Sequence, residues 1–329
     1  QPFIAINDAL FSRVLGPTAD VEVIARRPHA FAHEAGVYVP ATDEVWFTSN
    51  LLRAGPSIRV EISKLRLDTL AVEAVELPAV PLGNGGCLYR GHLLFCEQGS
   101  LDTPSQLVLV DPLPPYQSQP ILNNLHGRRF NSLNDVIVLP PPHSCGSETI
   151  WFTDPTYGYE QGFRPSPQLP SQVYVFNPAT GAVRAVADGF DHPNGICFDP
   201  RGEVCYISDT AHIHGSGVID PSKTSTIYAF DVVWHGREPQ LQSRRLFAFC
   251  DSGVPDGIKC DELGNVYAGC GDGLHIWNNR LFELVKGGKK GGCANFCFVP
   301  GGRILCLAED TIYMVEGLVV EGSTIVAHR

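Results

Sequence analysis

The pattern that decides the fold is clearest at residues 193–209, PNGICFDPRGEVCYISD. A polar residue, Asn194, precedes a short apolar run, and a second β-rich run ends at Asp209. Asp, Pro and Gly at residues 199–202 are typical of a tight turn between two strands. The segment therefore predicts an antiparallel hairpin whose first strand begins with a polar side chain.

The same shape recurs along the whole chain at intervals of about 50 residues. Each repeat begins with an acidic or amide residue: Glu34, Asn84, Asn134, Asn194, Asp256 and Asn295. A period of about 40 to 50 residues with four strands per unit is typical of a propeller blade, and long helical periodicity is absent. We therefore predict one all-β domain over residues 1–329, a six-bladed β-propeller. Two β-sandwiches are the alternative, but they do not explain a polar residue that recurs at one position of each unit.

A ring of blades keeps an open sheet edge unless the two ends of the chain meet in one sheet. Residues 21–24, VEVI, are β-rich and lie near the start of the sequence. Residues 311–315, TIYMV, are β-rich and belong to the last repeat. We therefore expect these two segments to pair and close the ring.

Composition limits the classes of partner. Hydrophobic residues make up 44% of the 329 residues, enough for a sizeable core, and Lys+Arg 24 against Asp+Glu 35 gives a net charge of −11. That charge repels phosphate backbones, so we expect no nucleic-acid partner. No apolar run approaches the roughly 18 residues of a membrane span. We expect a monomer or small homo-oligomer that binds a small molecule. Because residue 1 is Gln, secretion or a secretory-lumen location after leader removal is favoured over the cytoplasm.

The chain has 11 cysteines, and most lie within apolar runs, which favours buried free thiols. Several are spaced so that they could face each other across hairpins, and one or two disulfides are the alternative. The candidate pairs are Cys87/Cys96, Cys197/Cys205, Cys260/Cys270 and Cys297/Cys306.

The innermost strand of each blade lines the central channel, so the six polar residues that begin these strands should converge near one mouth. Carboxylate and amide oxygens are hard ligands that suit Ca²⁺ before Mg²⁺, with Mn²⁺ and Zn²⁺ as further divalent candidates. A single Asn-Gly or Asp-Gly pair is more often a turn than a ligand. Several such polar residues, recurring at the same position of successive blades, predict a central metal site.

Five stretches of the sequence are similar to the SMP-30/gluconolactonase-like propellers, and within them to the fungal lactonohydrolase-like group. The resemblance covers nearly the whole chain, and the stretches that carry it are FAHEAGVY at 31–38, FNSLNDV at 130–136, WFTDP at 151–155, PNGI at 193–196 and PDGIK at 255–259. The resemblance implies that Glu34, Asn134, Asn194 and Asp256 bind the metal and that Asp256 is also the catalytic base. Ser132 stands where many members have a substrate-binding Arg.

The resemblance implies metal-dependent hydrolysis of a lactone, in which Asp256 takes a proton from water. A nearby histidine is the alternative base: His33, His192, His212 or His214. The aromatic segment 154–165 should overhang the channel mouth as a pocket wall. The expected substrate contacts are Asn84, Asn131, Tyr157, Tyr159, Phe163, His33 and His192.

Two other functional classes remain open at this point. One is a non-hydrolytic cyclase or pericyclase of secondary metabolism, of the hetero-Diels–Alder type, in which the pocket orients a reactive intermediate and the metal is structural. The other is a binding propeller without enzymatic activity.

Overall fold

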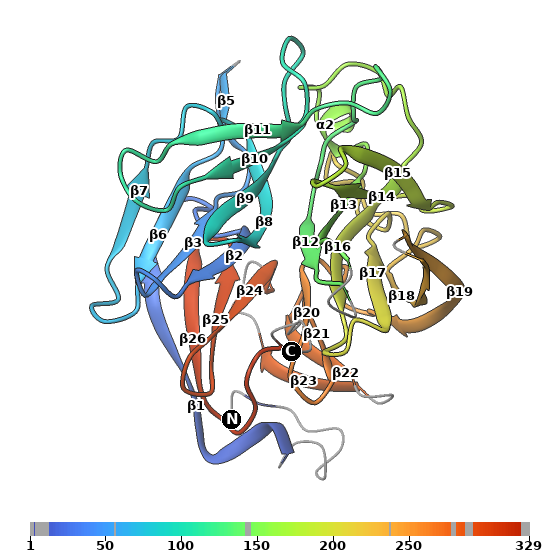
Figure 1. The fold of residues 1–329 in the computed structure, drawn as a ribbon. Coiled ribbons are helices and arrows are strands. Elements are labelled where there is room, and N and C mark those ends of the chain that lie inside the picture. The colour runs from blue at the N-terminus through green and yellow to red at the C-terminus, as the bar shows by residue number, and fades with distance from the viewer. Residues whose placement is uncertain are drawn as a thin grey trace.

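The computed structural model describes residue 3 and residues 13–55, 57–141, 146–236, 238–277, 281–286 and 292–323. Within these ranges, six four-stranded antiparallel sheets surround a central axis (Figure 1). The innermost strands of neighbouring blades contact each other around most of the ring. The prediction of a six-bladed β-propeller is confirmed, and the blades begin within a few residues of the predicted positions.

The first three blades each run from the innermost strand outward in chain order. Blade 1 contains β2 (Glu34–Val39), β3 (Glu44–Thr48), β6 (Ile62–Arg66) and β7 (Val72–Val75). Blade 2 contains β8 (Gly83–Tyr89), β9 (His92–Glu97), β10 (Gln106–Val110) and β11 (Ser118–Leu122). Blade 3 contains β12 (Val136–Leu139), β13 (Thr149–Asp154), β14 (Gln172–Asn177) and β15 (Ala182–Ala187).

The next two blades follow the same order, and the last takes its outer strand from the beginning of the chain. Blade 4 contains β16 (Pro193–Phe198), β17 (Val204–Asp209), β18 (Thr226–His235) and β19 (Glu238–Phe249). Blade 5 contains β20 (Ile258–Cys260), β21 (Val266–Cys270), β22 (Gly273–Trp277) and β23 (Leu281–Lys286). Blade 6 contains β24 (Asn295–Val299), β25 (Arg303–Ala308), β26 (Thr311–Leu318) and β1 (Leu15–Arg26).

Strand β1 closes the ring, as predicted. It pairs antiparallel with β26, so that Val21 lies opposite Val315 and Val23 opposite Tyr313. In Figure 1 the blue β1 lies beside the red β26. This pairing removes the open edge that β26 would otherwise present to solvent.

The core is divided into layers between neighbouring blades. Among the described residues, six clusters of buried apolar side chains fill the spaces between successive sheets. Strand β17 shows why: Cys205 and Ile207 pack toward blade 3, whereas the intervening Tyr206 packs toward blade 5. Because side chains alternate between the two faces of a strand and both faces are buried, the strands read as continuous apolar runs.

The hairpin disulfides are not formed: the ten cysteines in the described ranges are free thiols, and Cys145 lies outside those ranges. The favoured prediction of free thiols is confirmed for these ten residues, and register explains why the alternative pairs do not form. In blade 4, Cys197 lies opposite Tyr206, and Cys205 lies opposite Phe198. A shift of one residue places the two thiols on opposite faces of the sheet, so they pack in different inter-blade clusters.

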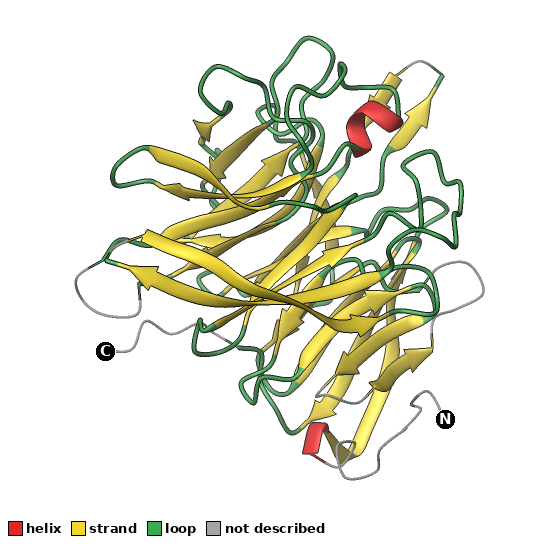
Figure 2. Ribbon diagram, turned by 90° about the vertical axis from the view of Figure 1, so that its right-hand side faces the viewer, coloured by secondary structure: helices red, strands yellow, loops and turns green. Residues whose placement is uncertain are grey.

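Irregular elements gather at the ends of the propeller. A hairpin of β4 (Leu52–Ala54) and β5 (Ser57–Arg59) leaves blade 1, and the short helix α2 (Tyr157–Glu160) follows β13. Figure 2 shows α2 among the loops at one end of the molecule. No helix in the described ranges is long and apolar enough to cross a membrane.

Removal of β1 should destabilise the whole ring. A chain that starts at residue 27 leaves the outer edge of β26 unpaired and removes Leu15, which is buried against blades 5 and 6. We expect its melting temperature to fall by roughly 10 °C or more, because burying the side chains of one such strand is worth several kcal/mol. A chain that starts at Arg13 keeps β1 and is the control. Equal melting temperatures for the two chains would contradict closure by β1.

Candidate active site

The polar residues at the blade starts surround one mouth of the channel. A cavity of about 400 Å³ opens there, and its lining includes Glu34, Asn84, Asn134, Asn194 and Asp256. These residues come from blades 1 to 5, each from the start of the innermost strand or the residues just before it. The structure thus brings together all four predicted metal ligands and Asn84.

Glycines explain how five blades approach one point so closely. A Cβ on Gly85 would lie 2.5 Å from the Asn134 carbonyl oxygen, and one on Gly195 would lie 2.4 Å from that of Asp256. A real Cβ is not found at such distances from backbone. The Asn-Gly and Asp-Gly pairs are therefore not simple turn signals, since each glycine provides the space into which the next blade packs.

Three amide oxygens point into this mouth without a partner. The Oδ1 atoms of Asn84, Asn134 and Asn194 are buried and accept no hydrogen bond from any residue that the structure describes. Asn194 is held in one orientation, because its Nδ2 donates to Thr210 Oγ1 at 3.3 Å. A buried acceptor without a partner costs about 1–3 kcal/mol. Three such acceptors at one point therefore indicate a site built to bind something electropositive.

Two carboxylates complete the oxygen set. Ligand atoms of His33, Glu34 and Asp256 all lie within 4.8 Å of one another. Burial and the charge of Asp256 raise the pKa of Glu34 well above its usual value. Burial also raises the pKa of Asp256, and the Glu309 carboxylate adds to that shift. Neighbouring buried carboxylates of this kind are stabilised by a cation between them.

Asn295, the sixth residue of the predicted ring, has a supporting role. Its Nδ2 donates to Glu34 Oε2 at 2.7 Å, and its Oδ1 accepts from the Phe296 backbone N–H at 2.7 Å. Lys259 Nζ also donates to this Oδ1, at 3.3 Å. Both ends of the amide are therefore used, and Asn295 orients Glu34 instead of facing the cavity as a free ligand.

Glu309 is a site residue that the sequence pattern did not reveal. Its Oε1 lies 2.7 Å from His33 Nδ1, and both residues line the cavity. Burial opposes protonation of His33, but Glu309 and the nearby carboxylates raise its pKa to about 10. The available signal was an acidic residue at the end of the second strand of a blade, the place that Asp154 and Asp209 occupy in blades 3 and 4.

The residues at this mouth fit a hard divalent cation. The donors are two carboxylates and up to three amide oxygens, and Ca²⁺ takes six to eight such oxygen ligands. The unpartnered Oδ1 atoms of Asn84, Asn134 and Asn194 are the observation that decides the fit. Glu34, Asn134, Asn194 and Asp256 would hold the ion, and Asn84 lies where it can contact the ion or its ligand.

The segment 154–165 forms one wall, but only part of it faces the cavity. Tyr157, at the start of α2, lines the cavity and hydrogen-bonds Thr210 Oγ1, which also holds Asn194. Tyr159 is 49% exposed and lies outside the lining. Phe163 is buried beneath the segment. The expected substrate contact is therefore retained for Tyr157, whereas Tyr159 and Phe163 lack access to the cavity.

His192 also lies outside this cavity lining. Its ring stacks on Tyr157 with centroids 4.7 Å apart, and its Nε2 lies 2.6 Å from Glu160 Oε1. Burial opposes ionisation of Glu160, but hydrogen bonds from His192 and Gly215 lower its pKa to about 2. His192 and Glu160 thus hold α2 and the position of Tyr157, and the structure places His192 behind Tyr157 and outside the lining of this cavity.

Asn131 and Ser132 serve the loop architecture. Asn131 Nδ2 donates to the backbone carbonyl of Leu169 at 3.1 Å, and Asn131 lies outside the cavity lining. Its buried Oδ1 has no hydrogen-bond partner among the described residues. Ser132 is buried and donates to Gln98 Oε1 at 3.3 Å. The buried Arg164 binds the carbonyl oxygens of Phe130 and Asn131, so its guanidinium supports the wall and does not replace the missing substrate-binding Arg.

Comparison with known proteins agrees with this geometry. The model of the SMP-30/gluconolactonase/LRE-like region matches residues 34–302. The chain belongs to this family of propellers.

Three similar proteins have names that describe an activity or a ligand. A lactonohydrolase of Aspergillus oryzae, oryL, is 29% identical over 86% of this chain and 66% of its own length, so the chain spans somewhat less than two thirds of that relative. The fold is similar to a gluconolactonase from Xanthomonas campestris, with a TM-score of 0.77, 24% identity, and 97% and 95% of the two chains covered. It is also similar to the calcium-binding protein regucalcin from Agrobacterium tumefaciens, with a TM-score of 0.62, 18% identity, and 93% and 95% covered.

The close approach of the blades can be tested at Gly195. An alanine there would force its Cβ against the Asp256 carbonyl, so Gly195→Ala should lower the free energy of unfolding by about 1–3 kcal/mol and weaken binding of Ca²⁺. Gly181→Ala is the control, since Gly181 has φ of +73° and open space around it. It should lose only about 1 kcal/mol and leave Ca²⁺ binding unchanged. Urea denaturation and calorimetric titration measure both quantities, and unchanged Ca²⁺ affinity in Gly195→Ala would refute the argument.

Proposed function

We propose that this protein is a metal-dependent hydrolase that opens a lactone ring by adding water. The observation that supports this most strongly is the set of three unpartnered amide oxygens beside Glu34 and Asp256 at the floor of an open cavity. Lactonohydrolase and gluconolactonase are the names of similar proteins. The substrate is therefore a small cyclic ester held at the channel mouth.

Each residue of the site has a stated task in this proposal. Glu34, Asn134, Asn194 and Asp256 hold the cation, and Asn295 keeps Glu34 in place through its 2.7 Å hydrogen bond. When bound, a divalent cation polarises an ester oxygen and makes water more acidic. Tyr157 forms the wall against which the substrate lies.

Asp256 is the proposed base. Its carboxylate lines the cavity, and its raised pKa makes it a better proton acceptor than an ordinary aspartate. An Oδ of Asp256 takes one proton from the attacking water as the water oxygen bonds to the ester carbonyl carbon. The bond between that carbon and the ring oxygen then breaks, and Asp256 returns the proton to the ring oxygen, which leaves as an alcohol while the carbonyl carbon becomes a carboxyl group. His33 is the second candidate base, but Glu309 and its carboxylate neighbours favour its protonated form, in which it can only donate.

The cyclase or pericyclase alternative gains no support from the pocket wall. In the sequence, this alternative was supported by an aromatic loop that could orient an apolar intermediate. Tyr159 and Phe163 lie outside the cavity lining, so Tyr157 alone of these three aromatics faces it. The remaining lining combines amides and carboxylates with apolar side chains such as Leu51, Val60 and Ile213, and a small ester has both polar and apolar parts to match it.

Asp256→Asn tests the base. Asparagine keeps an oxygen near the same place but removes the charge and the proton acceptor, so hydrolysis of the best substrate from a lactone panel should fall by roughly 10² to 10⁴. If Asp256 is the base, the rate of hydrolysis should fall less in His33→Gln than in Asp256→Asn. Asp231→Asn, at an exposed ion pair with Arg245, is the control and should keep full activity. Near-full activity of Asp256→Asn on the same substrate would exclude proton abstraction by this residue.

Glu34→Gln separates metal binding from proton transfer. The change removes charge from the cation site without removing the proposed base, so activity should fall at low Ca²⁺ and recover in part as Ca²⁺ is raised. Initial rates against free Ca²⁺ after chelation give the half-saturating concentration, which should rise by about tenfold or more. The proposal fails if chelation leaves wild-type turnover unchanged.

A further inference from the structure

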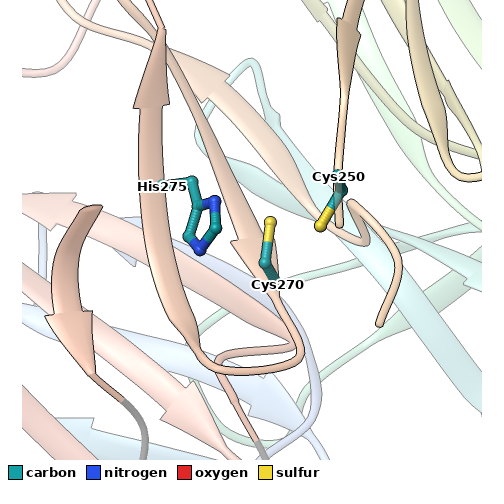
Figure 3. A group of neighbouring side chains, drawn as sticks. All are labelled: Cys250, Cys270 and His275. Atoms are coloured by element: carbon teal, nitrogen blue, oxygen red, sulfur yellow. The ribbon is translucent and has the colours of Figure 1, made fainter. Parts of the chain in front are cut away.

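A second group of metal-binding side chains lies apart from the oxygen site. Cys250, Cys270 and His275 offer ligand atoms that all lie within 4.8 Å of one another. Cys250 follows β19 of blade 4, Cys270 ends β21, and His275 lies in β22 of blade 5. Figure 3 shows the two sulfur atoms and the imidazole gathered where the chain from blade 4 meets this hairpin.

All three side chains are shielded from bulk water. Exposure is 1% for Cys250 and 2% each for Cys270 and His275. Cys270 also belongs to the lining of the cavity at the channel mouth, which gives a small ion a route to the cluster. A cysteine or histidine buried among apolar residues needs no explanation by itself, so the argument depends on how the imidazole is bonded.

His275 is bonded at one nitrogen only. Its Nε2 lies 2.8 Å from Asp272 Oδ1, whereas its Nδ1 is buried without a hydrogen-bond partner. A carboxylate at Nε2 favours the tautomer in which that nitrogen carries the proton and Nδ1 keeps its lone pair. The same carboxylate–histidine arrangement orients imidazole ligands in zinc proteins. An unshared lone pair beside two thiols is an unsatisfied acceptor unless an ion binds it.

The two thiols lie close enough to bind one ion. Their hydrogen bond lowers the pKa of Cys250, against the effect of burial, whereas burial and the same hydrogen bond raise the pKa of Cys270. Ligand atoms of a tetrahedral zinc site lie roughly 3.3–3.8 Å apart, so small side-chain rotations within the 4.8 Å cluster bring all three to bonding distance.

We propose that Cys250, Cys270 and His275 bind a divalent ion that prefers thiolates, Zn²⁺ before any other. Thiolate and imidazole ligands select zinc over calcium, whereas the oxygen donors at the channel mouth do the reverse. Three protein ligands leave one tetrahedral position for water. The ion links the end of blade 4 to the β21–β22 hairpin of blade 5. This site stands on its own observations and does not depend on the proposed hydrolysis.

Cobalt substitution tests the site in the intact protein. The full chain is purified under reducing conditions without chelator, zinc is measured by mass spectrometry, and the metal-free protein is titrated with Co²⁺. We expect about one equivalent of zinc as purified and, with Co²⁺, near-ultraviolet absorption from thiolate-to-cobalt charge transfer. Oxygen ligands do not give that band, so Co²⁺ bound at the channel mouth would not produce it. The Asp256→Asn variant should therefore still show the band.

Variants assign the ligands. Cys250→Ser, Cys270→Ser and His275→Gln should each lose or alter the charge-transfer band, and Asp272→Asn should weaken Zn²⁺ binding by about 10- to 100-fold. Cys96→Ser, which removes a buried thiol from β9 in blade 2, is the matched control and should keep the band unchanged.

Three outcomes would overturn the proposal. The first is the absence of a charge-transfer band at saturating Co²⁺, and the second is a band that persists unchanged in both Cys250→Ser and Cys270→Ser. The third is a Cys250–Cys270 disulfide in protein that was purified under reducing conditions. The wild-type spectrum decides the first of these even if a variant fails to fold.

Discussion

The architecture depends on how closely the innermost strands approach the central axis. Gly85 and Gly195 lie directly against the backbone of the blade that follows each of them. A side chain at either position would push neighbouring blades apart, and the polar residues before these glycines would then lose their common focus. The glycines, and not the carboxylates or amides alone, set how closely the oxygen donors approach one another. The lack of side chains at these glycines thus determines how closely the carboxylates and amide oxygens gather at the channel mouth.

The sequence was sufficient to predict features that repeat. Glu34, Asn84, Asn134, Asn194 and Asp256 could be placed at one mouth because a polar residue recurs at blade spacing, and strand closure followed from the need to pair every edge. Features that occur once were harder. The loop roles of Asn131 and Phe163 depend on side-chain directions that no period encodes. The alternative of hairpin disulfides could not be decided from the sequence, because spacing along the chain does not give strand register. Asn295 shared the pattern of the ligands, but its partners gave it a different task.

The two clusters of potential ligands differ in chemistry in a way that allows both to be filled at once. Oxygen donors around Glu34 and Asp256 discriminate against soft ions, and the thiols of Cys250 and Cys270 discriminate against hard ones. The clusters share an access route, since Cys270 and Asp256 both line the same cavity. Selectivity must therefore come from the ligands themselves and not from separate entrances.

The closure of the ring by β1 and β26 has a consequence during synthesis. The two strands are separated by almost the whole chain, so β1 leaves the ribosome long before its partner exists. Blade 6 cannot form until residues 295–318 have emerged, and an unpaired β-strand is prone to join other chains. Late closure makes folding slow in the way expected for contacts between distant residues. Five blades would thus wait, assembled or partly assembled, with one side of the ring open to chaperones and to other nascent chains.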